Sequence, residues 1–225
     1  MHPITEDDIA NYLANSPDFF ARHAELLAAV QLTSPHGNRA VSLQERQAEM
    51  LREKIKALEH RIMDMVRHGN ENMVISDRIH RWARTLLLVT SGRALPATLV
   101  AELKNQFMVP HVALKVWDVD ERYRMEPFAQ DVSEDTKSFA TSLTQPYCGV
   151  NAGIEAASWL EDAASVMSLA LIPLRDGGAG EPGRAFGLLV LGSPDPQRYE
   201  AGMATDFLER IAELASAALA RLRPR

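Results

Sequence analysis

The chain has 225 residues, of which 46% are hydrophobic and 24% charged, and this balance excludes an extensively disordered protein. Its formal net charge of −6 argues against nucleic acid as a partner, because phosphate backbones are bound by clustered Lys and Arg. The single cysteine, Cys148, excludes an internal disulfide and a multi-thiolate metal site, and it suits a reducing cytosol.

The start of the chain carries acidic residues where a secretory signal would carry basic residues and then an apolar core. No run reaches the roughly 18 apolar residues that a membrane span needs. We therefore expect a cytoplasmic protein with no membrane partner.

Two short helices are predicted within the first thirty residues. Thr5 followed by Asp8 resembles a capping box, and Ser16 with Pro17 gives an N-cap followed by proline at the first helical position. A turn-rich linker over residues 33–40 follows them. The apolar face of the second helix would consist of Phe19, His23, Leu26 and Val30.

A long helix is predicted over residues 42–90. Apolar residues recur there in alternating steps of four and three, which is the a/d spacing of a coiled-coil seam. The first run is Leu51, Ile55, Leu58, Ile62 and Met65. A second run, out of phase with the first by a stammer near Gly69, is Ile75, Ile79, Trp82, Leu86 and Val89.

So long an apolar stripe needs a partner helix, most economically the same helix of a second copy. The predicted homodimer seam consists of Leu51, Ile55, Leu58, Ile62, Met65, Ile75, Ile79 and Trp82. The alternative is pairing with the short N-terminal helices of the same chain, which could cover only part of the stripe.

Helices and strands are mixed in the remainder of the chain. The residue patterns predict helices over 95–107, 133–143 and 201–222, and strands over 111–119, 165–174 and 185–193. The Gly-rich stretch "RDGGAGEPGR" would join the last two strands into a hairpin. The predicted fold class is therefore α+β, with a long helix followed by a sheet flanked by helices.

The order of these last elements resembles the C-terminal half of a GAF domain. The residues that carry the resemblance are Ile172-Pro173-Leu174, Phe186-Gly187-Leu188 and the acidic-aromatic stretch 195–199. The resemblance covers about residues 75–222 and implies a GAF/PAS-like antiparallel sheet. Such domains bind small molecules or serve as dimerisation and signalling modules.

The stretches "DDIANYLANSPDFFARHAELL" and "HVALKVWD" and the long-helix sequence resemble an uncharacterised proteobacterial family of unknown function. That resemblance covers essentially the whole chain and implies an architecture without an established activity. It divides the chain into short helices and a linker (1–40), a coiled-coil helix (41–74) and a GAF-like domain (75–225).

Departures from better-known GAF subfamilies prevent the assignment of a cofactor. Cys148 is not beside a histidine, as in members that attach a tetrapyrrole, and it lacks the partner cysteines of the free-methionine-sulfoxide reductases. The motif that binds cyclic nucleotides is also missing. No catalytic triad or metal-binding motif can be assembled, so we predict no catalytic residue and no metal site.

Two pairs of residues are candidates for a ligand pocket. Lys115 and Trp117 share one face of the strand 111–119, where they could meet an anionic group and a planar group. The alternative is that Lys115 reaches the rim and Trp117 fills core. Tyr147 and Cys148 lie in "QPYCG", which we interpret as a structural turn and, alternatively, as a pocket mouth with an oxidant-sensing thiol.

The leading hypothesis is a non-enzymatic sensory or protein-interaction module that acts as a coiled-coil homodimer. It leaves open a small molecule in the sheet pocket and a protein partner on the N-terminal helices. One alternative is an enzyme, for example of redox type, that uses Cys148 or the face with Lys115 and Trp117. A further alternative is a purely structural dimer without a ligand.

Overall fold

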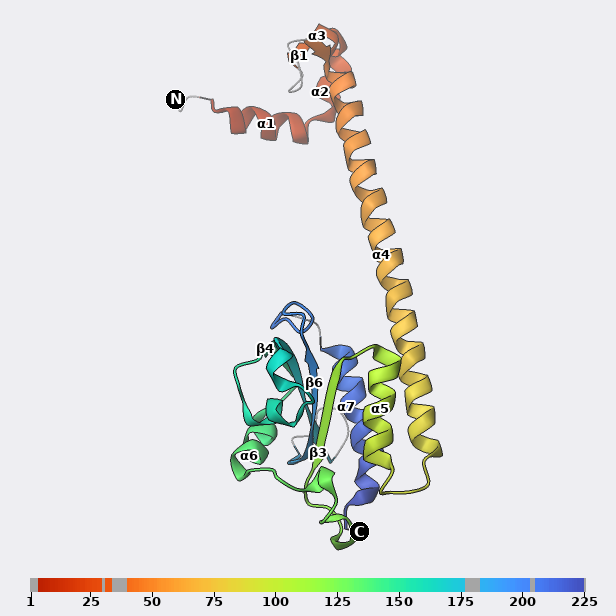
Figure 1. Cartoon of the computed structure of the whole chain (residues 1–225). Coiled ribbons are helices and arrows are strands. Elements are labelled where there is room, and N and C mark those ends of the chain that lie inside the picture. Colours follow the sequence, from red (N-terminus) through yellow and green to blue (C-terminus); the bar gives the residue numbers. More distant parts are fainter. Residues whose placement is uncertain (1–3, 30, 34–39, 177–182, 203–204, 225) are drawn as a thin grey trace. The chain divides into compact units, whose positions relative to one another are not determined.

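A computed structural model of the chain describes residues 4–29, 31–33, 40–176, 183–202 and 205–224. The chain forms two compact units, Met1–Asn70 and Glu71–Arg225, and the division between them falls inside one long helix (Figure 1). None of the described helices is long and apolar enough to cross a membrane.

The first unit begins with three short helices where the sequence predicted two. Thr5 caps α1 as expected, because its side chain accepts from the amide of Asp8 and the Asp8 carboxylate accepts from the amide of Thr5. The predicted second helix is interrupted at His23, whose backbone (φ −120°, ψ 39°) leaves the helical region. Val30 and residues 34–39 of the predicted linker lie outside the described residues. The elements are α1 (Glu6–Asn15), α2 (Pro17–Arg22), α3 (Ala24–Ala29), β1 (Gln31–Thr33) and β2 (Ala40–Ser42).

The long helix is confirmed as α4, Leu43–Leu88, a single element of 46 residues. At 1.5 Å per residue it is about 69 Å long. Gly69 does not break it, and a Cβ added there would meet nothing within 4 Å. One helix therefore continues from the first unit into the second.

The second unit is built on a four-stranded antiparallel sheet of order β3-β6-β5-β4. The hairpin of the two most apolar strands is confirmed, with Ser168 opposite Ser193 and Leu174 opposite Gly187. The strands are β3 (His111–Val116), β4 (Tyr147–Val150), β5 (Ser168–Arg175) and β6 (Ala185–Ser193).

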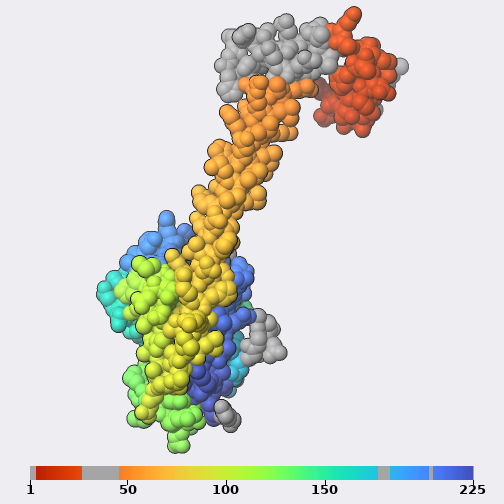
Figure 2. All heavy atoms as spheres, turned by 90° about the vertical axis from the view of Figure 1, so that its right-hand side faces the viewer, coloured from red at the N-terminus to blue at the C-terminus, as the bar shows by residue number. Residues whose placement is uncertain are grey.

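Helices cover both faces of this sheet (Figure 1). On one face α5 (Leu95–Phe107), α7 (Asp206–Leu219) and the last part of α4 form a large apolar core with the sheet. Figure 2 shows those last turns of α4, in yellow, beside α7 in blue. The other face packs against α6 (Glu134–Ser142) and the 3-10 helix η3 (Glu155–Trp159). The predicted α+β fold with a helix-flanked antiparallel sheet is thus confirmed.

Short 3-10 turns connect these elements. They are η1 (Glu121–Tyr123), η2 (Pro127–Ala129), η4 (Ala163–Ser165) and η5 (Ala220–Leu222).

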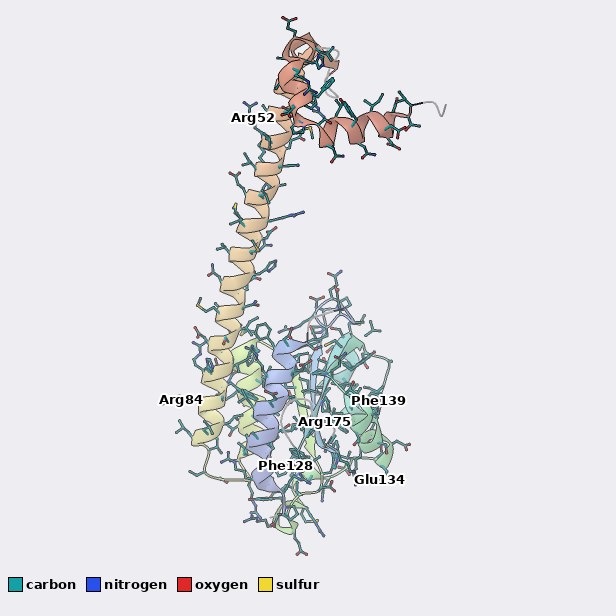
Figure 3. All side chains as sticks on the ribbon, turned by 180° about the vertical axis from the view of Figure 1, so that it is seen from behind. Arg52, Arg84, Phe128, Glu134, Phe139 and Arg175 are labelled. Atoms are coloured by element: carbon teal, nitrogen blue, oxygen red, sulfur yellow. The ribbon has the colours of Figure 1, made fainter. Side chains whose placement is uncertain are left out.

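Two arginines of the second unit donate hydrogen bonds to the C-terminal ends of helices in that unit. The guanidinium of Arg175, at the end of β5, donates to the carbonyls of Ala140 (3.2 Å) and Thr141 (2.9 Å) in the last turn of α6. Arg175, labelled in Figure 3, is partly exposed. Arg221 donates to the carbonyls of Leu86 (2.9 Å) and Val89 (3.1 Å) at the end of α4. Both contacts satisfy carbonyls that a helix end leaves without intrahelical partners.

The strands β3 and β4 differ from the predictions for these stretches. The strand predicted over 111–119 ends at Val116, because Asp118 adopts a left-handed backbone (φ 54°) that a strand cannot contain. The predicted turn at "QPYCG" is wrong, since Tyr147 begins the edge strand β4, which pairs with β5.

Candidate functional site

The sheet face that carries Lys115 is packed with the chain's own side chains. Trp117 and Leu188 of this face are buried, together with Ala140 of α6 and Ala156 of η3, in one apolar cluster. As predicted, Val112, Leu114 and Val116 belong to the opposite face, which packs on the long helices. The face proposed for a ligand therefore serves as a second core.

The polar atoms of Lys115 and Trp117 are already engaged. The Lys115 ammonium donates to the carbonyls of Pro127 (2.9 Å) and Gln130 (2.8 Å). The indole N–H of Trp117 donates to the carbonyl of Ala185 (2.7 Å), and its ring is 6% exposed. In this arrangement the lysine binds two loop carbonyls and the tryptophan fills core.

The second candidate pair lies at the other edge of the sheet. Three strand spacings separate β3 from β4, roughly 14 Å at about 4.8 Å each. Tyr147 is exposed, whereas Cys148 is buried in the core that the sheet forms with α4, α5 and α7. The four predicted pocket residues are therefore not brought together.

Burial also affects the chemistry of Cys148. It raises the pKa of the thiol above its ordinary value. A thiol with a raised pKa carries less thiolate at neutral pH, and the thiolate is the reactive form. Its environment is that of a structural cysteine.

A cavity of about 490 Å³ lies near the C-terminus of the chain. Its cationic groups all have partners: Arg122 pairs with Asp120, Arg223 pairs with Asp176, and Arg221 binds the end of α4. The lining residues are Asp120, Arg122, Ala220, Arg221, Arg223 and Pro224.

The first run of the predicted seam is exposed in the part of the first unit that the structure describes. Its five side chains are between 53% and 65% exposed, although they recur on one face of α4 at coiled-coil spacing. Figure 2 shows this stretch of α4 in orange. The residues, which we call the α4 seam, are Leu51, Ile55, Leu58, Ile62 and Met65.

The second run has a different role. Trp82 is completely buried and Ile79 is 5% exposed, both within the core that α4 forms with the sheet of its own chain. Ile75 is partly buried against the same core. Their assignment to a dimer seam is therefore corrected: the core of one chain already contains these side chains.

The family of the chain follows from its sequence as a whole. A family model described as "Protein of unknown function, DUF484" matches residues 1–223. The chain belongs to the DUF484 family. A curated relative of this DUF484 protein is the uncharacterized protein YigA of Salmonella typhimurium strain LT2. The two are 28% identical in an alignment 227 positions long, which spans 91% of this chain and 86% of YigA.

Solved structures similar to this DUF484 protein include the GAF domain of an Acinetobacter phosphoenolpyruvate-protein phosphotransferase. It shares 16% identity at a TM-score of 0.47, over 64% of this chain and 92% of that domain. Another is a free methionine-R-sulfoxide reductase from Neisseria meningitidis in complex with its substrate. It shares 16% identity at a TM-score of 0.44, over 65% and 88% of the two chains. Likeness at this level says nothing about the activity of the DUF484 chain.

Two structural residues of this DUF484 protein were missed by the sequence reasoning. Arg175 binds carbonyls of α6, and Glu155 accepts from the hydroxyls of Ser133 and Thr136 (2.7 Å for Thr136). These hydrogen bonds lower the pKa of the Glu155 carboxyl. The N-cap at Ser133 was visible in the sequence, but the acceptor 22 residues later had no local signal.

Proposed function

We propose that this protein is a non-enzymatic protein-interaction module that assembles as a homodimer through the α4 seam. The observation that supports it is the seam itself: five apolar side chains at 4-3-4-3 spacing, each more than half exposed in one chain. A contiguous exposed apolar surface marks an interaction site. The heptad spacing specifies that the partner is another helix.

The environment of the predicted pocket residues gives no support to the enzyme alternative. Cys148 is buried with a raised pKa, and the charged head of Lys115 is held by two backbone carbonyls. A redox nucleophile needs an accessible thiolate, and an anion site needs an available cation. For this reason we propose that the protein acts through its assembly rather than through a reaction at the sheet.

The N-terminal helices supply the surface for a further protein in this proposal. No residue of α1 or α2 is buried. Ile9 and Tyr12 of α1 and Leu26 of α3 are more than half exposed. The rings of Tyr12 and Phe19 make an edge-on contact (centroids 6.0 Å apart), which gives the surface an aromatic centre. Dimerisation would present two copies of this surface.

The test is the mass of the protein in solution. Light scattering across a hundredfold range of concentration should give twice the chain mass of 24.9 kDa in its upper part. Leu58→Glu places a carboxylate in the middle of the seam in both copies and should raise the dissociation constant at least about 100-fold.

Met63→Glu is the matched control. Met63 is also an exposed apolar residue of α4 (68%), but it is not on the face of the helix that carries the seam, so its substitution should leave the dimer intact. A monomer at every concentration would refute the proposal. Equal dissociation by both variants would show that the effect is general to the helix rather than specific to the seam.

A further inference from the structure

The heptad positions of the α4 seam carry information about how two copies meet. In a heptad the step from a to d is three residues and the step from d to a is four. Ile55 and Ile62 therefore occupy a positions, and the d positions are Leu51, Leu58 and Met65. Among parallel coiled coils, β-branched residues at a with leucine at d favour two strands over three or four.

The charges at the e and g positions beside the seam favour a parallel orientation. Lys54 occupies a g position and Glu59 the e position of the following heptad. In a parallel in-register pair a g side chain faces this e position of the other helix, so Lys54 of each copy faces Glu59 of the other. Both side chains are exposed and neither makes an ion pair within the described chain. The next g position, Arg61, faces the neutral Val66.

An antiparallel pair of the same stretch brings like charges together. In the antiparallel register that sets a positions opposite d positions, Leu51 lies opposite Ile62 and Ile55 opposite Leu58, and g positions face g positions. Lys54 then faces Arg61 at two symmetric places, while Arg52 faces Glu59 favourably. Like charges across an interface are unfavourable, and the parallel arrangement has no such pair in this stretch.

We propose that the occupant of the α4 seam is a second copy of this chain, parallel and in register over residues 51–65, with Lys54 facing Glu59 across the interface. This inference rests on the proposed homodimer and specifies its geometry. Parallel pairing places the N-terminal helices of both copies at the same end of the coiled coil, so that a partner meets two identical surfaces together.

Disulfide trapping tests the orientation in the full-length chain. In a Cys148→Ser background, single cysteines are introduced as Leu51→Cys and Ile62→Cys, and the two variants are mixed before mild oxidation. Parallel in-register pairing should give 51–51 and 62–62 products. Glu53→Cys, which lies on the outward-facing side of the helix, is the control and should give no product above background.

Each result of the trapping experiment supports or overturns the parallel arrangement. Predominantly mixed 51–62 products would show antiparallel pairing and overturn this inference while leaving the homodimer standing. A dimer by light scattering that yields no trapped product at either position would also overturn it. Loss of the dimer itself would instead contradict the proposed function.

Charge reversal gives an independent answer without new cysteines. In the parallel pair Lys54→Glu faces Glu59 and should weaken the dimer about tenfold, and adding Glu59→Lys should restore it. In the antiparallel pair Lys54→Glu would face Arg61 and strengthen the dimer. Lys56→Glu makes the same charge change off the seam and should have little effect. A tighter Lys54→Glu dimer would therefore overturn the parallel arrangement.

Discussion

Glu155 fastens the first turn of α6 to the segment that follows β4. Its carboxylate accepts from the amide of Ser133 (3.1 Å) and from the hydroxyls of Ser133 and Thr136. These donors favour the charged form, which is why the pKa of this carboxyl lies below its ordinary value. The contacts therefore stabilise the fold most strongly while the carboxyl is ionised.

This gives a pH-dependent prediction for Glu155→Gln. The folded pKa is lowered, so the stabilisation is complete above the ordinary value of about 4.3 and is lost as the pH falls through the folded value. The wild type should have a higher urea midpoint than the variant at neutral pH, and the gap should shrink below about pH 4. Urea unfolding followed by tryptophan fluorescence measures it.

Glu134→Gln is the control: Glu134 lies in the first turn of α6 (Figure 3) and takes no part in these hydrogen bonds, and its exposed carboxylate pairs with Lys137. A gap for Glu155→Gln that stays constant down to acidic pH would contradict the assigned role of the carboxylate.

The candidate pocket shows what sequence can and cannot predict at this scale. Alternation along residues 111–117 correctly placed Lys115 and Trp117 on one sheet face. Their hydrogen-bond partners come from residues 12 to 68 positions away, Pro127, Gln130 and Ala185. Such long-range contacts leave no local pattern, so the choice between pocket and core needed the structure.

At the scale of elements, α4 contains a glycine, Gly69, at a position where a larger side chain would fit. A Cβ at Gly69 meets nothing within 4 Å, and glycine costs a helix interior about 1 kcal/mol relative to alanine. Gly69→Ala should therefore stabilise the helix by about 0.5–1 kcal/mol. Thermal unfolding followed by circular dichroism checks this.

Gly153→Ala makes the same change of side chain but should lower the stability of the fold. Its surroundings are equally open, but its φ of +73° lies in the left-handed region. The expected effect is a destabilisation of about 1 kcal/mol. If both substitutions acted with the same sign, backbone conformation would not be the property that decides them.

Elements with strong local signals were predicted well. The long helix, the hairpin of β5 and β6, and α6 behind its Ser133 cap follow from periodicity, apolar runs and capping residues. The edge strand β4 was missed because four residues are too few to display an alternating pattern. The run from Ile75 to Trp82 has coiled-coil spacing, but periodicity cannot distinguish a partner helix from a core in the same chain.

On the scale of the whole molecule, the two units can be observed separately. All three tryptophans, Trp82, Trp117 and Trp159, lie in the unit Glu71–Arg225, whereas the α4 seam lies in the other unit. A dimer through the seam stabilises the seam helix by mass action. Raising the protein concentration tenfold should shift a helical transition seen by far-ultraviolet circular dichroism, while the tryptophan fluorescence transition stays in place.

Equal shifts of both signals would mean that the second unit takes part in assembly or unfolds together with the first. The Leu58→Glu variant separates the two readings, because it should abolish the concentration dependence without moving the fluorescence transition.

The continuity of α4 has a consequence for how this family can diverge. Met65, the last seam residue, and Ile75, which packs against the core of the second unit, are ten positions apart in the sequence. Effects of substitutions that far apart are usually additive, so each run can accept changes without a compensating change in the other. Under the proposed pairing, relatives can exchange one seam for another, and so change their partners, while inheriting the same folded domain.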